Sequence, residues 1–179
     1  MKHKLKLTAT LFSCSTFFLC SQTIAEDIPI NITGEVFLTS CQVNNGKVIE
    51  VDFGDISVTD VSNARNQKTI AIPVSCDYSQ GTAYVKVTGS QLGSYTNVLA
   101  SNVTNFGIAL YQGEGTSTKL VLGNGLGNTT TSIGYPITNG LSGTDTGVFV
   151  ITAVPFKDGS SQLEAKAFSA SASISITYY

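Results

Sequence analysis

The segment that decides the fold lies at the C-terminus, where residues 168–178 have the sequence FSASASISITY. Every second residue is apolar, and the residues between them are serines and one threonine. Successive side chains of a β-strand point to opposite faces, so this pattern predicts a strand with one apolar face and one hydroxyl-bearing face. The apolar face comprises Phe168, Ala170, Ala172, Ile174, Ile176 and Tyr178.

A second alternating segment, DIPINITGEV, spans residues 27–36 near the other end of the chain. One face carries Ile28, Ile30, Ile32, Gly34 and Val36, and the other carries Pro29, Asn31, Thr33 and Glu35. Two alternatives follow from a strand at each end. Both strands pair inside their own domain, or the N-terminal strand pairs with a neighbouring molecule, and periodicity does not choose between them.

Short strand-like runs fill the chain between these ends and predict an all-β sandwich. The segment Asn44-Asn45-Gly46 predicts a tight hairpin between the runs on either side, because Asn and Gly adopt positive φ angles readily. Residues 148–156 are apolar almost throughout, which is typical of a strand covered on both faces. The runs are residues 48–53, 70–76, 84–87, 106–110, 119–122 and 148–156.

The first 25 residues have the pattern of a secretory signal peptide. Lys2, Lys4 and Lys6 precede an uncharged run, and Thr23-Ile24-Ala25 supplies small residues for cleavage after Ala25. Cleavage leaves 154 residues, enough for one domain, and shifts the formal charge from −2 to about −5. An acidic domain without a lysine or arginine cluster does not favour nucleic-acid binding.

Two cysteines, Cys41 and Cys76, remain after cleavage. Disulfides form and persist in exported proteins, so the pair is expected to be joined rather than to remain as two buried thiols. Nucleophilic catalysis with histidine is excluded in the mature chain, because the single histidine is His3. Asp52 and Asp55 flank Gly54 in a predicted solvated turn, and we expect no catalytic residue, cofactor or metal site.

The chain resembles subunits of chaperone–usher pili, especially the minor tip subunits of type 1-like pili. The resemblance covers the whole mature chain and depends on both alternating strands, the Cys41–Cys76 pair and the penultimate Tyr178. In one respect the chain departs from the family pattern. The family has a glycine fourteenth from the C-terminus, where this chain has Lys166.

The resemblance implies an incomplete immunoglobulin-like β-sandwich that lacks its final strand. It implies a signal peptide (1–25), a donor-strand extension (26–36) and a pilin domain (37–179). The donor residues are Ile28, Ile30, Ile32, Gly34 and Val36, and the chaperone-recognition strand carries Phe168, Ala170, Ala172, Ile174, Ile176 and Tyr178.

The partners implied are a periplasmic chaperone, an outer-membrane usher and neighbouring subunits. The expected location is a fibre on the cell surface that supports adhesion, reached through the periplasm, and the expected function is structural. Two alternatives stay open: a carbohydrate-binding adhesin subunit, and a self-contained periplasmic β-sandwich.

Overall fold

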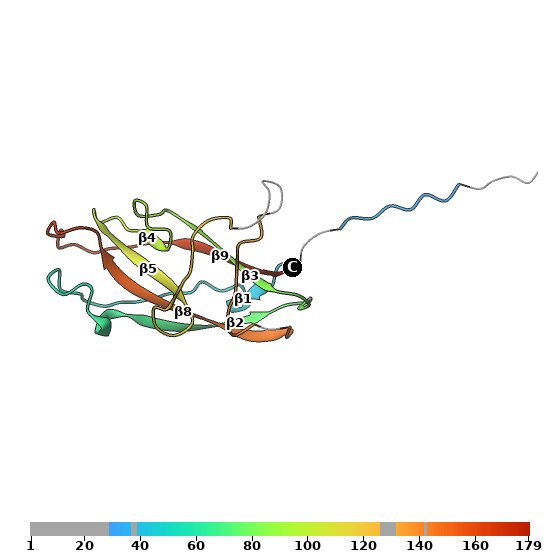
Figure 1. Ribbon diagram of the computed structural model, residues 1–179, viewed down its shortest axis with the longest axis horizontal. Coiled ribbons are helices and arrows are strands. Elements are labelled where there is room, and N and C mark those ends of the chain that lie inside the picture. The colour runs from blue at the N-terminus through green and yellow to red at the C-terminus, as the bar shows by residue number, and fades with distance from the viewer. Residues whose placement is uncertain (1–28, 37–38, 126–131, 142) are drawn as a thin grey trace, which may run out of the picture. The chain divides into compact units, whose positions relative to one another are not determined.

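Antiparallel strands make up nearly all the regular structure of the described residues (Figure 1). The computed structural model describes residues 29–36, 39–125, 132–141 and 143–179. The chain divides between Glu35 and Val36, and both sheets belong to the second unit, Val36–Tyr179. The strands are β1 (Gln42–Val43), β2 (Lys68–Ser75), β3 (Ala83–Gly89), β4 (Val98–Ala100), β5 (Phe106–Gln112), β6 (Thr118–Lys119), β7 (Tyr135–Pro136), β8 (Thr146–Lys157) and β9 (Ala172–Tyr178), with short 3-10 turns η1 (Asn44–Gly46) and η2 (Ala64–Asn66).

The strands form two sheets. The larger has the order β1-β2-β8-β5-β4, with β6 paired to β5, and the smaller has the order β7-β3-β9. The apolar run at 148–156 becomes the centre of the larger sheet, where β8 pairs with β2 on one edge and with β5 on the other. The C-terminal alternating segment becomes β9, which pairs with β3 from Ala83↔Tyr178 to Gly89↔Ala172.

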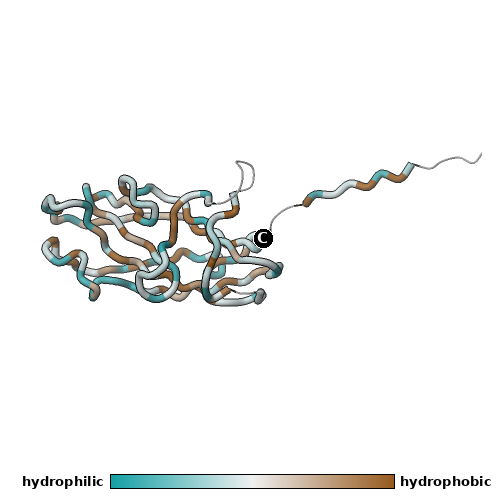
Figure 2. The backbone as a smooth tube through the Cα atoms, in the orientation of Figure 1, coloured by the Kyte–Doolittle hydropathy of each residue, from teal (hydrophilic) through white to brown (hydrophobic). Residues whose placement is uncertain are grey.

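The core lies between the sheets and takes side chains from both. Ile72 and Phe149 from the larger sheet are almost completely buried, as are Val85 and Ile176 from the smaller. Apolar and polar residues alternate along the tube in Figure 2, as expected for strands with one face in the core. The all-β sandwich predicted from the spacing of strands and turns is therefore confirmed.

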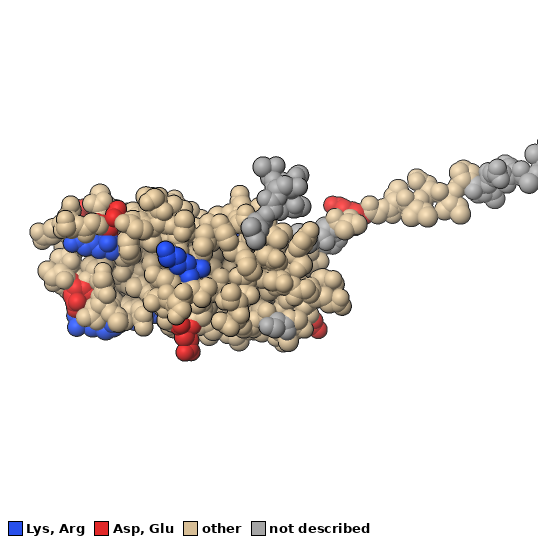
Figure 3. Space-filling view, in the orientation of Figure 1, with Lys and Arg blue, Asp and Glu red and all other residues tan. Residues whose placement is uncertain are grey.

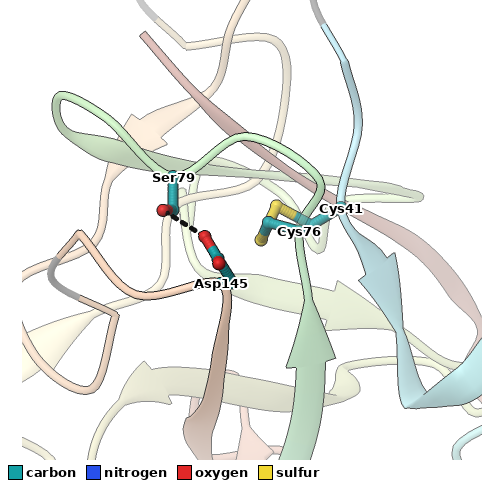
Figure 4. Close-up of a disulfide and its surroundings, with 4 residues drawn as sticks. All are labelled: Cys41, Cys76, Ser79 and Asp145. Carbon is teal, nitrogen blue, oxygen red and sulfur yellow. Dashed lines mark hydrogen bonds between the residues drawn. A yellow bond between two sulfur atoms is a disulfide. The ribbon is translucent and has the colours of Figure 1, made fainter.

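A disulfide joins Cys41, just before β1, to Cys76, just after β2 (Figure 4). The Cys41 amide also donates to the Ile176 carbonyl at 2.8 Å, and the Cys76 amide donates to the Asp145 carbonyl at 2.7 Å. The Ser79 hydroxyl donates to the Asp145 carboxylate at 2.7 Å. The disulfide thus lies where both sheets and the loop before β8 meet.

The predicted hairpin at residues 44–46 is wrong, although the turn itself is present. Asn44, Asn45 and Gly46 all have positive φ, as their sequence predicts. However, β1 before the turn pairs with β2, and residues 48–53 after it belong to no strand. The turn redirects the chain along the sandwich and does not return it onto β1.

Candidate functional site: an open apolar groove

An open groove of about 580 Å³ runs along one side of the sandwich. Two extended segments, residues 48–53 and 168–174, form its rims. Its floor consists of apolar side chains from both sheets, including Ile72, Val87, Ile108, Leu110, Leu120 and Ile151. The groove therefore exposes the edge of the hydrophobic core, where a sandwich of this kind has room for one more strand.

Residues 48–53 form the first rim and have the side-chain pattern of a strand without a strand partner. Ile49, Val51 and Phe53 are half-buried and pack against the core, whereas Glu50 and Asp52 are exposed. Within the described residues, the backbone of 48–53 makes no hydrogen bond to the backbone of another segment. The predicted solvated turn follows: the Gly54 amide donates to the Asp52 carboxylate at 2.8 Å, and Gly54 has a φ of +62°.

Residues 168–174, which include the start of β9, form the second rim. One edge of β9 pairs with β3, and described residues cover its other edge only near the C-terminus. There Ser40 lies opposite Thr177, and Cys41 bonds to Ile176. Both rims of the groove therefore carry backbone donors and acceptors that an added strand can use.

The rim begins before β9, at residues 168–171. This stretch was predicted as part of the strand, but it is extended chain outside any sheet. Asn102 holds this stretch in place. Its backbone amide donates to the Ser169 carbonyl at 3.3 Å, and its side-chain oxygen accepts from the Ser169 backbone amide at 2.8 Å. Phe168 contacts Phe53 across the groove with ring centroids 6.0 Å apart.

The apolar face predicted for residues 168–178 divides into two parts. Phe168, Ala170, Ala172 and Ile174 line the groove. Ile176 and Tyr178 are buried in the core of the domain, with 0% and 2% of their surfaces exposed.

The N-terminal alternating segment is described from residue 29 onward, and Ile28 lies outside the described residues. Residues 29–36 belong to no strand. Ile30, Ile32 and Val36 are 84%, 88% and 101% exposed. No atom lies within 4 Å of the place where a Cβ on Gly34 would stand.

A smaller cavity of about 150 Å³ lies next to Phe168. Its apolar lining comes from 56–61, 103–106 and Leu163. Sequence reasoning missed this cavity, because its walls combine loop residues with the start of β5, and these segments lie far apart in the sequence. Lys166, at the position where the family has glycine, also lines it and forms an ion pair with Glu164 at 2.7 Å. Lys166 does not have a positive φ, so the turn does not require glycine here.

The described residues offer little for other chemistry. They contain no group of three or more His, Cys, Asp or Glu side chains that could hold a metal ion. None of the helices among them has the length and hydropathy of a membrane span. On the face drawn in Figure 3, charged side chains of both signs are scattered over a mostly uncharged surface.

The family model described as "Fimbrial protein" matches residues 30–179. The chain belongs to the fimbrial protein family. Over 164 residues it is 46% identical to the fimbrial adapter PapF of Escherichia coli, covering 91% of this chain and 95% of that protein. It is equally similar, by identity and coverage, to the minor fimbrial protein PrsF of the same organism.

Solved structures agree with this membership. The P pilus adaptor subunit PapF matches with a TM-score of 0.56 at 38% identity, covering 81% of this chain and all of that one. The P pilus rod subunit PapA matches with a TM-score of 0.51 at 17% identity and supports the fold alone. The immunoglobulin-like pilin sandwich implied by the sequence is confirmed.

This fimbrial protein is a structural subunit of a chaperone–usher pilus. Its partners are the chaperone, the usher and neighbouring subunits, and it is exported through the periplasm to an extracellular fimbrium.

Proposed function

We propose that this subunit polymerises by donor-strand exchange. The groove between residues 48–53 and 168–174 receives an extended segment from the following subunit. Residues 26–36 of this chain fill the corresponding groove of the subunit ahead. The observation that carries the proposal is the apolar groove, along which described residues leave one backbone edge of each rim open, in a chain whose own apolar N-terminal segment is exposed.

Strand addition explains the residue pattern of the extension. Backbone hydrogen bonds to the two rims hold the added strand, and alternate side chains enter the groove. Burying Ile28, Ile30, Ile32 and Val36 contributes about 6–12 kcal/mol before ordering costs are subtracted. Gly34 allows the backbone of the extension to lie close to the groove of the subunit ahead, at a position where a larger side chain would not fit.

The same groove explains the need for a chaperone. An open core and an unpaired strand edge promote aggregation, so a covering strand is required until polymerisation. We assign this contact to residues 168–178, with Phe168, Ala170, Ala172 and Ile174 facing the chaperone strand. Ile176 and Tyr178 anchor the recognition strand from inside the domain. Residues 1–25 act as the signal peptide, and the pilin domain extends over 37–179.

We assign the subunit to a minor, adaptor-type position that supports adhesion indirectly and has no enzymatic activity. The 46% identity to an adapter and to a minor fimbrial protein supports this position. The carbohydrate-binding adhesin is less well supported, because the described domain is a single sandwich. The self-contained sandwich is less well supported because Ile30 and Ile32 are exposed and residues 29–36 join no sheet.

Deleting residues 26–33 tests the proposal. The shortened subunit should fold with its chaperone and accept a donor peptide in its groove, yet fail to join the subunit ahead, so that fibres stop at that point. Gly34→Leu should slow the same joint without destabilising the domain. The proposal is wrong if the deletion unfolds the isolated domain while the molecules that remain folded still polymerise.

A further inference from the structure

The first rim of the groove is acidic and has no counterion within the described residues. Glu50 and Asp52 alternate with the half-buried Ile49, Val51 and Phe53, so both carboxylates point away from the core at the mouth of the groove. The ion pairs of the described chain are Arg65–Asp60 and Lys166–Glu164, and neither involves this rim. The opposite rim carries the uncharged Ser169 and Ser171.

The contacts across the groove fix the relative direction of its rims. Phe53 meets Phe168 at one end, and Cys41 bonds to Ile176 at the other. Residues 48–53 therefore run antiparallel to residues 168–176. A strand inserted antiparallel to β9 lies parallel to residues 48–53, with its C-terminal end beside Asp52 and Phe53.

The outward side chains of such a strand stand on the same face as Glu50 and Asp52. Side chains on one face of paired strands lie close enough to interact, and like charges destabilise the pair. The outward face of this chain's own extension carries Pro29, Asn31, Thr33 and Glu35, of which only Glu35 is charged. Because Glu35 lies near the C-terminal end of the extension, insertion into another copy would bring it beside Asp52.

We propose that the groove of this subunit accepts the extension of a different pilus subunit, one with lysine or arginine on its outward face, and discriminates against a second copy of this chain. This inference rests on the proposed function, because it concerns the occupant of the same groove. A cross-strand charge pair changes an equilibrium by a factor of roughly 1.5 to 5. A lysine in place of Glu35 turns repulsion from Glu50 and Asp52 into attraction, so its effect on the binding equilibrium should be larger than that of one charge pair.

Peptide exchange tests the proposal. The subunit is isolated as its complex with the periplasmic chaperone, and synthetic peptides are added at about 20 mM and at about 500 mM salt. One peptide has the sequence of residues 26–36, and the other differs only by Glu35→Lys. The lysine peptide should enter the groove at least about threefold faster at low salt, and the difference should shrink at high salt because salt screens exposed charges. Native gels and mass spectrometry measure the products.

Matched subunit variants separate charge from shape. Glu50→Gln with Asp52→Asn removes both charges and keeps an acceptor for the Gly54 amide, so the preference for the lysine peptide should disappear. Equal entry of the two peptides into the unchanged subunit at low salt overturns the inference and leaves the proposed function intact. If neither peptide enters a folded subunit, the groove does not receive donor strands, and both the inference and the proposed function are wrong.

Discussion

Two features of this domain depend on single residues: the disulfide and the packing of β9 into the core. Cys41 and Cys76 were predicted as a pair from export and from the family resemblance, and the structure brings them together at the junction of the two sheets. The role of Tyr178 was less predictable. Sequence alternation assigned it to the apolar face, but only the three-dimensional fold separates the buried Ile176 and Tyr178 from the groove-lining Ile174.

Removing the disulfide should destabilise the domain without changing its fold. Cys41→Ser together with Cys76→Ser should lower the free energy of unfolding by about 3–4 kcal/mol, because the unfolded chain regains the freedom of the closed loop. Denaturant unfolding of the chaperone-free, peptide-filled subunit measures the loss. Two alkylatable thiols in the freshly isolated natural protein would contradict the pairing.

Tyr178 offers a conservative test of burial. Its hydroxyl is buried and has no hydrogen-bond partner among the described residues. Tyr178→Phe should therefore leave stability unchanged or raise it, because an unsatisfied buried hydroxyl is costly. Tyr178→Ser should lower stability by several kcal/mol through the loss of a buried ring, roughly 3–5 kcal/mol for aromatic truncation. Thermal unfolding compares the two variants, and equal losses would show that the ring is not packed in the core.

Tyr95, which packs against Phe156 of β8, provides a titration signal that depends on the folded state. Its hydroxyl donates to the Asp158 carboxylate at 2.7 Å, and this hydrogen bond, with the nearby charge, raises the pKa of Tyr95. The folded state thus holds the phenol proton more tightly, and this contribution to stability is present below pH 10 and is lost as pH rises through the raised pKa. Asp158→Asn should lower the pKa of Tyr95, measured from phenolate absorbance. An unchanged titration curve would exclude the contact.

The strands predicted best are the long ones, in which alternating or continuous apolar residues coincide with extensive backbone pairing to a neighbouring strand. β2, β3, β5, β8 and most of β9 coincide with predicted runs. The runs at 48–53 and 168–171 have the correct alternation and still form no strand. A strand requires a partner, and the neighbouring β3 ends at Gly89, opposite Ala172. The strands β1, β4 and β7 have only two or three residues, too few for a period to be recognised. The groove floor combines residues far apart in sequence, so no local pattern predicts it.

The two isoleucines of β9 form a matched pair that separates packing from strand capture. Ile176→Ala should destabilise the domain by about 2–5 kcal/mol, because its side chain is fully buried. Ile174→Ala should cost much less stability but weaken binding of the chaperone or of a donor peptide, because Ile174 lines the groove. Denaturant unfolding and peptide-exchange rates measure the two effects. Identical stability losses would place both residues in the core.

At the scale of the whole molecule, the sandwich lacks one strand, and β9, which forms one rim of the vacant site, ends at Tyr178, next to the C-terminal residue. A donor strand fused after Tyr179 through a short linker can enter antiparallel to β9. Such a self-complemented subunit should be monomeric, independent of chaperone and more stable, with Tm higher by at least about 10 °C given the apolar area that it buries. Calorimetry and gel filtration check this. A fusion with a scrambled donor sequence of equal length is the control and should give no increase.

The position of the disulfide matters once a fibre is pulled. If residues 26–36 are anchored in the subunit ahead, tension enters this domain just before Cys41 and passes through the sulfur–sulfur bond into β2, which is held to β8 along its whole length. While this bond is intact, the 34 residues between Cys41 and Cys76 cannot be drawn out into an extended chain. Reduction removes that shortcut, so stretching a single reduced subunit should release roughly 120 Å of additional chain, at about 3.5 Å per residue. The disulfide would then limit how far a stretched subunit can extend, because it prevents the segment from β1 to β2 from unravelling under tension.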